Sequence, residues 1–279
     1  MQIVDDRALV LRVKDPHKIR GAIKHSKILT DNKVLVKWGI DECQILRSMD
    51  IKAPSPIEKK YKWTGQYAPF DHQKTTSAFL TLRKRAFCFN EQGTGKTASA
   101  IWASDYLLSQ GVINRVLIVC PLSIMDSAWR DDLFKFAMHR TVDIAYGSAK
   151  KRKEIVANDA EYIVTNYDGL AILEKDLSSR DLIIVDEATH YKNARTDRWK
   201  VLNRMVKPHT WVWMMTGTPA AQSPLDAYGL AKIVNPTSVP RFYGSFRDQV
   251  MLRVSQFKWM PKPDSSTIVY NALQPATFY

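Results

Sequence analysis

The chain has 279 residues, of which 45% are hydrophobic and 25% are charged, values that exclude a disordered protein and fit one large domain with a smaller one. Lys and Arg outnumber Asp and Glu by 41 to 28, which gives a net charge of +13. This excess favours a polyanionic partner such as nucleic acid, although a lysine-rich solubilising surface would give the same balance.

The three cysteines, Cys43, Cys88 and Cys120, are far apart and odd in number. This spacing argues against a disulfide framework or a zinc site and is typical of proteins in a reducing cytoplasm. The first residues carry acidic groups and only a short apolar run, so they predict neither a signal peptide nor a membrane span. We therefore expect a cytoplasmic protein that does not enter a membrane.

Residues 1–60 predict a small α+β accessory domain. Strand patterns at 8–13 and 33–38 alternate with helical spacing at 16–26 and 41–49. A Pro-Ser-Pro break at 54–56 follows, which indicates a domain boundary. The domain holds 13 Lys and Arg against 8 Asp and Glu, so it is either a DNA-binding module or a stabilising cap with a solvated basic face.

Residues 61–237 predict an α/β domain. Short apolar runs lie at 86–90, 116–120, 142–146, 162–166, 182–186 and 211–215, with helical segments such as 97–110 between them. Alternating strands and helices predict a three-layer parallel sheet with helices on both faces. Ligands bind beyond the carboxyl ends of such strands.

The segment Asn90–Thr97 has the pattern of a phosphate-binding loop between a strand and a helix. Gly93 and Gly95 let backbone N–H groups surround phosphate oxygens, and the helix N-terminus favours negative charge. Lys96 is placed to contact the β- and γ-phosphates, and the Thr97 hydroxyl to bind Mg²⁺. Asn90 stands where the general pattern has Gly. The sequence therefore predicts ATP and Mg²⁺ as ligands.

Two further motifs follow at later strand ends. Asp186 can hold Mg²⁺ directly or through water, and Glu187 can orient the attacking water and accept its proton. The segment 216–219, Thr-Gly-Thr-Pro, places the Thr216 and Thr218 hydroxyls where they can sense the γ-phosphate. Each of these two motifs alone is a common turn. Their position after the phosphate loop, in the same chain order, favours the functional interpretation.

Together these motifs resemble the first RecA-like domain of superfamily-two helicases, within the branch of Swi/Snf-like double-stranded DNA translocases. The resemblance covers roughly residues 66–236. It implies that Gln73 contacts adenine, next to a nearby aromatic from Trp63, Tyr67 or Phe70. It also implies a nucleotide-binding loop that includes Gln92 and Thr94, with Lys96 and Glu187 as catalytic residues.

The same resemblance implies sequence-independent DNA contacts at two strand ends, with Pro121 and Ser123 at the first and Thr165 and Asn166 at the second. The family motif Asp-Glu-Ala-His has Thr189 in place of its histidine, so His190 is the expected coupling residue together with Thr216 and Thr218.

Residues 238–279 are similar to the segment that leads to a second RecA-like domain in the family, and we expect that domain to be absent from this chain. The isolated chain is then expected to be a monomer that binds ATP weakly and hydrolyses it poorly. We predict the N-terminal half of an ATP-dependent duplex-DNA translocase from a bacterial or phage-infected cell rather than a nucleus. Two alternatives stay open: an ATP-liganded nucleic-acid-binding module without turnover, and a helicase acting on RNA or single strands.

Overall fold

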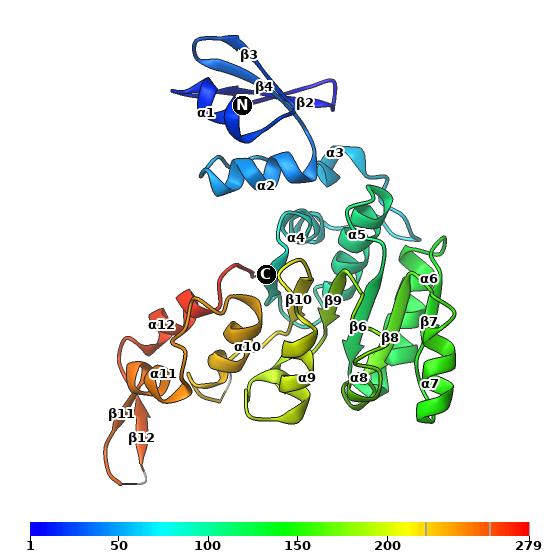
Figure 1. Cartoon of the computed structure of the whole chain (residues 1–279), viewed down its shortest axis with the longest axis vertical. Helices are drawn as coiled ribbons and strands as arrows, with labels where there is room; N and C mark the ends of the chain where they lie inside the picture. Colours follow the sequence, from blue (N-terminus) through cyan, green and yellow to red (C-terminus); the bar gives the residue numbers. More distant parts are fainter. Residues whose placement is uncertain (221, 257, 279) are drawn as a thin grey trace.

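The computed structural model describes residues 1–220, 222–256 and 258–278. Within them the chain forms a small antiparallel N-terminal sheet, a large parallel sheet with helices on both sides, and a C-terminal segment of helices and a hairpin (Figure 1). No helix in these ranges is long and apolar enough to cross a membrane.

The N-terminal unit confirms the predicted small α+β domain. Its four-stranded sheet has the order β1-β2-β4-β3 with antiparallel neighbours. The predicted helix at 16–26 ends at residue 22, because the chain turns there to begin β3. The elements are β1 (Gln2–Val4), β2 (Ala8–Arg12), α1 (Pro16–Ala22), β3 (Ser26–Thr30), β4 (Lys33–Lys37), α2 (Ile40–Ser48) and α3 (Ile57–Lys60).

The large sheet has seven strands in the order β13-β5-β10-β9-β6-β8-β7, and all neighbours are parallel. Helices cover both faces of the sheet, so side chains on both sides of a central strand are buried. The central strands are therefore continuous apolar runs. Its strands are β5 (Arg85–Cys88), β6 (Val116–Cys120), β7 (Val142–Ile144), β8 (Tyr162–Asn166), β9 (Leu182–Val185), β10 (Trp211–Met215) and β13 (Ala276–Thr277).

Two hydrophobic cores separate the three layers. One face of the sheet packs on α4 (Asp71–Thr81), α5 (Lys96–Ser109), the π-helical η2 (Met125–Arg130) and α6 (Asp131–Phe136). The other face packs on α7 (Ala149–Val156), α8 (Tyr167–Ile172), α9 (Asp197–Met205) and α10 (Asp226–Val234). This arrangement confirms the predicted three-layer α/β architecture.

The C-terminal segment returns to the large sheet. It contains α11 (Tyr243–Val250), the hairpin of β11 (Met251–Arg253) and β12 (Trp259–Pro261), and α12 (Ser265–Ala272). The chain then adds β13 beside β5 at the sheet edge. Sequence analysis missed β13, since a two-residue strand has no periodicity. The proposed boundary at residue 237 therefore separates segments that share one sheet.

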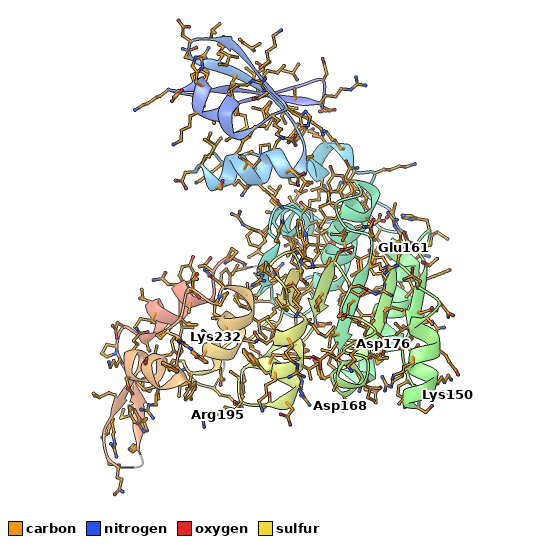
Figure 2. All side chains as sticks on the ribbon, in the orientation of Figure 1. Lys150, Glu161, Asp168, Asp176, Arg195 and Lys232 are labelled. Atoms are coloured by element: carbon orange, nitrogen blue, oxygen red, sulfur yellow. The ribbon has the colours of Figure 1, made fainter. Side chains whose placement is uncertain are left out.

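The N-terminal domain packs against α4 on the side where the strands of the large sheet begin, away from the motif-bearing ends (Figure 1). Ser55 and Thr81 hydroxyls lie 2.7 Å apart across this contact, and Ala53 and Ile57 join the core that contains Leu80. Glu161 precedes β8 and Asp168 follows it. Figure 2 shows Glu161 on the side of the N-terminal domain and Asp168 at the opposite edge of the sheet.

Candidate functional site

The three chemistry-bearing motifs lie at the carboxyl ends of β5, β10 and β9, which are adjacent strands of the large sheet. The loop after β10 runs directly beside the loop after β5. A Cβ placed on Gly217 would lie 3.7 Å from both Asn90 O and Gln92 N. Segments more than 120 residues apart in sequence are thus brought into contact at one sheet edge.

The phosphate-loop motif forms a tight strand-to-helix turn. Gly93 has φ +79° and Gly95 has φ +76°, the left-handed region in which a side chain is strained. Helix α5 begins at Lys96, and the Lys96 Nζ donates to Asn90 O and Glu91 O, both at 2.9 Å. Backbone N–H groups and a lysine are therefore gathered at the start of a helix, an arrangement suited to phosphate.

Gln73, which the family resemblance implies contacts adenine, lies against this loop. It sits in the first turn of α4, where its Nε2 donates to Thr94 O at 3.2 Å and its Oε1 accepts from Phe70 N at 3.0 Å. The His72 ring nitrogen Nε2 is 2.9 Å from the same Thr94 oxygen. The amide of Gln73 is thus positioned by the loop that it borders.

A cavity of about 350 Å³ opens between Gln73 and the phosphate loop. Sequence analysis missed two of its lining residues, Asp132 and Phe136 of α6. Nothing in their local pattern distinguishes them from an ordinary amphipathic helix. The remaining lining residues are Gln73, Gly93, Gly95, Lys96, Thr97 and Ala98.

The aromatic residues proposed to cover adenine differ in their surroundings. Trp63 packs edge-on against Tyr61 and Trp102, at ring-centroid distances of 5.3 and 5.7 Å. Tyr67 and Phe70 are both about two-thirds exposed (68% and 67%), and Phe70 stacks on His72. Tyr67 and Phe70 therefore have free ring surface, whereas Trp63 belongs to the core.

Asn90, which departs from the phosphate-loop pattern, joins the loop to α4. Its side chain is buried, and Nδ2 donates to Thr76 Oγ1 at 2.8 Å. Its Oδ1 is buried without a hydrogen-bond partner among the described residues. A glycine here would lack the link to the helix that carries Gln73.

Asp186 is the buried carboxylate of the site. Its Oδ2 accepts from Trp129 Nε1 at 3.0 Å, and its Oδ1 accepts from the Glu187 N–H at 2.9 Å. Burial raises the pKa of Asp186 above its usual range, while both donors and Lys96 oppose that rise. Trp129 lies on η2, and sequence analysis missed it because a lone tryptophan usually belongs to a core.

Glu187 follows Asp186 in an unusual backbone conformation. Its φ of +47° and ψ of +55° are left-handed, a region that non-glycine residues rarely adopt. The strained turn directs the chain into the 3₁₀ turn η3 (Ala188–Tyr191) and leaves the Glu187 side chain partly exposed. Strain of this kind is found preferentially at functional sites.

A second cavity, of about 310 Å³, brings the acidic motif together with the loop after β10. Its lining residues are Thr189, His190, Lys192, Thr218, Gln222 and Asp226. Lys192 Nζ donates to Gln222 Oε1 at 2.6 Å and to Asp226 Oδ2 at 3.2 Å. The tertiary structure thus joins η3 to α10 through Lys192, which sequence analysis did not assign.

His190, the predicted coupling residue, lies on this cavity together with Thr189 and Thr218. Its ring packs on Tyr167 at a centroid distance of 4.6 Å, and its Nδ1 is 3.3 Å from an Arg198 nitrogen. Burial and the nearby Arg198 charge lower the pKa of His190, although Glu187 opposes them. Thr216 is buried and its hydroxyl accepts from Thr218 N at 3.3 Å, which holds the loop after β10 in a turn.

The four residues predicted to contact DNA fall into two classes. Pro121 is partly exposed and Ser123 is exposed in the loop after β6. Thr165 and Asn166 are buried, and Arg152 donates to both side chains, at 3.3 and 3.0 Å. The Thr165 and Asn166 side chains therefore hold the end of β8 in this structure, and their contact with DNA stays a prediction.

A family model and similar proteins both relate this chain to SNF2 proteins. Residues 72–260 match the model of the SNF2-related domain. A protein called p41 from Acyrthosiphon pisum secondary endosymbiont phage 1 is 29% identical over 204 residues, which cover 67% of this chain and 44% of that protein. The SWI/SNF-related matrix-associated actin-dependent regulator of chromatin subfamily A-like protein 1 of Xenopus laevis is 26% identical, over 65% of this chain and 18% of that protein.

A solved structure supports the fold. The Sulfolobus solfataricus SWI2/SNF2 ATPase core in complex with dsDNA aligns with a TM-score of 0.62 and 21% identity, over 78% of this chain and 45% of that one. This likeness shows the RecA-like fold. The chain spans less than half the length of these relatives.

Proposed function

The chain belongs to the SNF2-related domain family, and from this premise we propose that it is the N-terminal half of an ATP-dependent translocase on duplex DNA. Residues 61–237 would form the first RecA-like, ATP-binding domain, and residues 238–279 would lead toward a second one. The family match supports an ATPase or helicase type of enzyme. That this chain hydrolyses ATP, and that its hydrolysis depends on DNA, are parts of the proposal.

One observation carries the proposal: three motifs of ATP chemistry meet at neighbouring strand ends. The phosphate loop, the Asp186–Glu187 pair and the Thr216–Thr218 turn follow β5, β9 and β10, and β10 lies between the other two. Ligands of open parallel sheets bind at this edge. All loops after parallel strands share this edge, and the specific feature is that strand order places these three loops side by side.

The residues present fit ATP with Mg²⁺. Left-handed Gly93 leaves room for phosphate against bare backbone, left-handed Gly95 lets the Gln73 amide approach the loop, and the cavity beside them extends to that amide. Gln92 and Thr94 complete the loop. Thr97 and Asp186 would hold Mg²⁺, which when bound supplies positive charge to the β- and γ-phosphate oxygens.

Hydrolysis would depend on Glu187 and Lys96. Glu187, partly exposed beside buried Asp186, would orient a water molecule in line with the γ-phosphorus and accept its proton. Lys96 would neutralise charge on the transferring phosphoryl group. Loss of that charge would be sensed across the second cavity by His190, Thr216 and Thr218, where the acidic motif meets the loop after β10.

Duplex DNA is the proposed partner. The chain has a net charge of +13, and Pro121 and Ser123 offer an exposed loop at the same sheet edge as the ATP site. The aligned archaeal ATPase core is described as a complex with dsDNA. Contacts to the phosphate backbone would make binding independent of sequence and strongly salt-sensitive. We further propose a monomer that acts in a bacterial or phage-infected cell, since one relative is a phage protein.

The test compares the 279-residue chain with its Glu187→Gln and Lys96→Ala variants. We expect the Glu187→Gln variant to keep the ATP affinity of the wild type but to lose single-turnover phosphate release by a factor on the order of a hundred. Lys96→Ala should lose affinity as well. Equal phosphate release by wild type and Glu187→Gln would favour a module that uses ATP only as a ligand.

The second measurement adds nucleic acid. We expect slow turnover by the chain alone, since this proposal assigns the other face of the ATP site to a second RecA-like domain. Strong stimulation by duplex DNA in the isolated chain would contradict that assignment. Preference for RNA or single strands in the same binding assay would instead support the single-strand helicase alternative.

A further inference from the structure

In the described part of the chain, α1 and α2 cover one face of the N-terminal sheet and no helix covers the other. Residues paired across antiparallel strands share a face, and the face toward α1 and α2 carries the buried side chains of Leu9, Leu11, Val34 and Val36. The residues between them point the opposite way. Val10 and Leu35, which pair with each other at the centre of this outward face, are only partly buried.

Cations surround that apolar centre. In the strand register, Arg12 lies opposite Lys33. Lys27 lies opposite Leu35, and Lys37 lies opposite Ala8, so all four cations lie on the outward face. No Asp or Glu occurs on any of the four strands. The nearby acids lie off the strands. Asp5, Asp6, Asp15 and Asp31 are in turns or at their ends, and Glu42 of α2 lies beside Gly39, close to the Lys37 side chain.

Among the described residues, none of these cations lies within 4.0 Å of a carboxylate oxygen. Residues 1–60 are all described, and the ion pairs of the described chain all involve residues beyond 60. A basic surface that only improved solubility would be interspersed with acids that pair with it. The outward face instead concentrates unpaired positive charge, which is suited to a polyanion.

The chemistry of the face favours a duplex over a single strand. Its centre is aliphatic, and none of the four strands carries an aromatic residue on which an unpaired base could stack. Lys33 and Lys37 are four residues apart on one strand, which is about 14 Å. This spacing is close to the roughly 12 Å width of the major groove, so two lysines can reach phosphates on both sides of it.

The face is held rigidly to the ATP-binding domain. Trp38 Nε1 donates to Pro54 O at 3.0 Å, and Lys60 donates to Trp38 O, so the connecting segment is fixed to the sheet. Figure 1 shows this domain at the amino ends of the large sheet, whereas the loop with Pro121 and Ser123 lies at the carboxyl ends. The two surfaces are therefore separate.

We propose that the outward face of the N-terminal sheet, formed by Arg12, Lys27, Lys33 and Lys37 around Val10 and Leu35, binds the phosphate backbone of duplex DNA. It is a second DNA-binding surface, distinct from the loops of the catalytic edge. The inference rests on the proposed function only in taking duplex DNA as the partner, and it requires no ATP turnover.

The test measures binding of a fluorescently labelled, mixed-sequence duplex to the full 279-residue chain by anisotropy over a series of salt concentrations. The first variant combines Lys27→Gln, Lys33→Gln and Lys37→Gln. The matched control combines Lys18→Gln, Lys24→Gln and Lys52→Gln, which removes the same charge from exposed positions of the same domain outside the outward face. Thermal unfolding and binding of a fluorescent ATP analogue verify that each variant is folded.

The outward-face variant should lose at least tenfold in duplex affinity, and the slope of log affinity against log salt should decrease by about two to three. The control variant should change both quantities far less. Equal losses in the two variants, no loss in either, or a loss seen only with single-stranded DNA or anionic lipid vesicles would overturn the proposal.

The same samples separate this proposal from the proposed function. Loss of duplex binding with intact ATP binding is the result expected for the outward face alone. A wild-type chain that binds duplex but not ATP would contradict the proposed function, and the outward-face and control variants would still decide this proposal. A wild-type chain that binds no duplex DNA would refute both.

Discussion

The indole N–H of Trp129 donates to the Asp186 carboxylate at 3.0 Å, which joins the helix after β6 to the acid at the end of β9. Both residues are buried, and the second Asp186 oxygen accepts from the Glu187 backbone. A carboxylate so held has little freedom to rotate. This contact therefore orients the side chain that we propose as the Mg²⁺ ligand.

Trp129→Phe should weaken Mg²⁺-dependent ATP binding while leaving the fold intact. The substitution keeps an aromatic ring but leaves a buried carboxylate oxygen without its donor, a loss of about 1–3 kcal/mol. We expect the Mg²⁺ concentration that half-saturates nucleotide binding to rise on the order of tenfold. Trp211→Phe, also buried but on β10 and facing Trp213, is the control and should lose stability only.

Asp186→Asn should change the pH dependence of stability. Burial raises the pKa of Asp186, so the folded state holds this proton to higher pH than the unfolded state, whose value is near 3.8. The stabilising contribution is present below that value and disappears as pH rises through the folded-state pKa. Without nucleotide, the melting temperature of the variant should therefore rise relative to that of the wild type as the pH increases from about 4 through the folded-state pKa of Asp186. The exposed Asp176→Asn variant is the control for the loss of one carboxyl group.

Gly95→Ala and Gly93→Ala form a matched pair in the phosphate loop. Both glycines have positive φ, so each alanine costs about 1–2 kcal/mol of backbone strain. Only at Gly95 would the new Cβ meet a neighbour, lying 2.1 Å from Gln73 Nε2, whereas nothing lies within 4 Å at Gly93. Gly95→Ala should therefore displace Gln73 and reduce the preference for ATP over GTP. An equal loss of preference in Gly93→Ala would argue against a role for Gln73 in contacting the base.

The Lys192–Asp226 pair should contribute measurably to stability. It joins η3 to α10 at 3.2 Å, and its side chains are 33% and 15% exposed. A double-mutant cycle with Lys192→Met and Asp226→Asn, followed by urea unfolding, should give a coupling energy of about 1 kcal/mol. The exposed Lys200–Asp197 pair is the control cycle, and its coupling should be near zero. Equal coupling in the two pairs would show that Lys192 has no special role.

Much of the fold followed from local sequence patterns. The apolar runs at 116–120, 162–166 and 211–215 coincide with β6, β8 and β10, because buried parallel strands require continuous apolar residues. The phosphate loop and the acidic motif were also located from sequence, since each follows an apolar strand with a short characteristic pattern, and Gln73 was located from the family resemblance. Their roles in binding and catalysis stay predictions until the variants above are measured.

Other features have no local pattern. Strand β13 is two residues long and pairs with β5, which lies nearly 190 residues earlier, so only long-range packing creates it. Thr165 looked like an exposed strand end, yet Arg152 from α7 donates to its hydroxyl and the residue is buried. The sequence of β8 contains no information about that arginine.

The sequence by itself determined the parallel α/β domain, the small basic domain before it and the order of the motifs, because periodicity and spacing are properties of short segments. The tertiary structure decided which strand ends are neighbours, that Trp129 orients Asp186, that Lys192 joins two motifs, and that four unpaired cations share the open face of the N-terminal sheet. Those relationships depend on strand order and register, which are set by the packing of the whole chain.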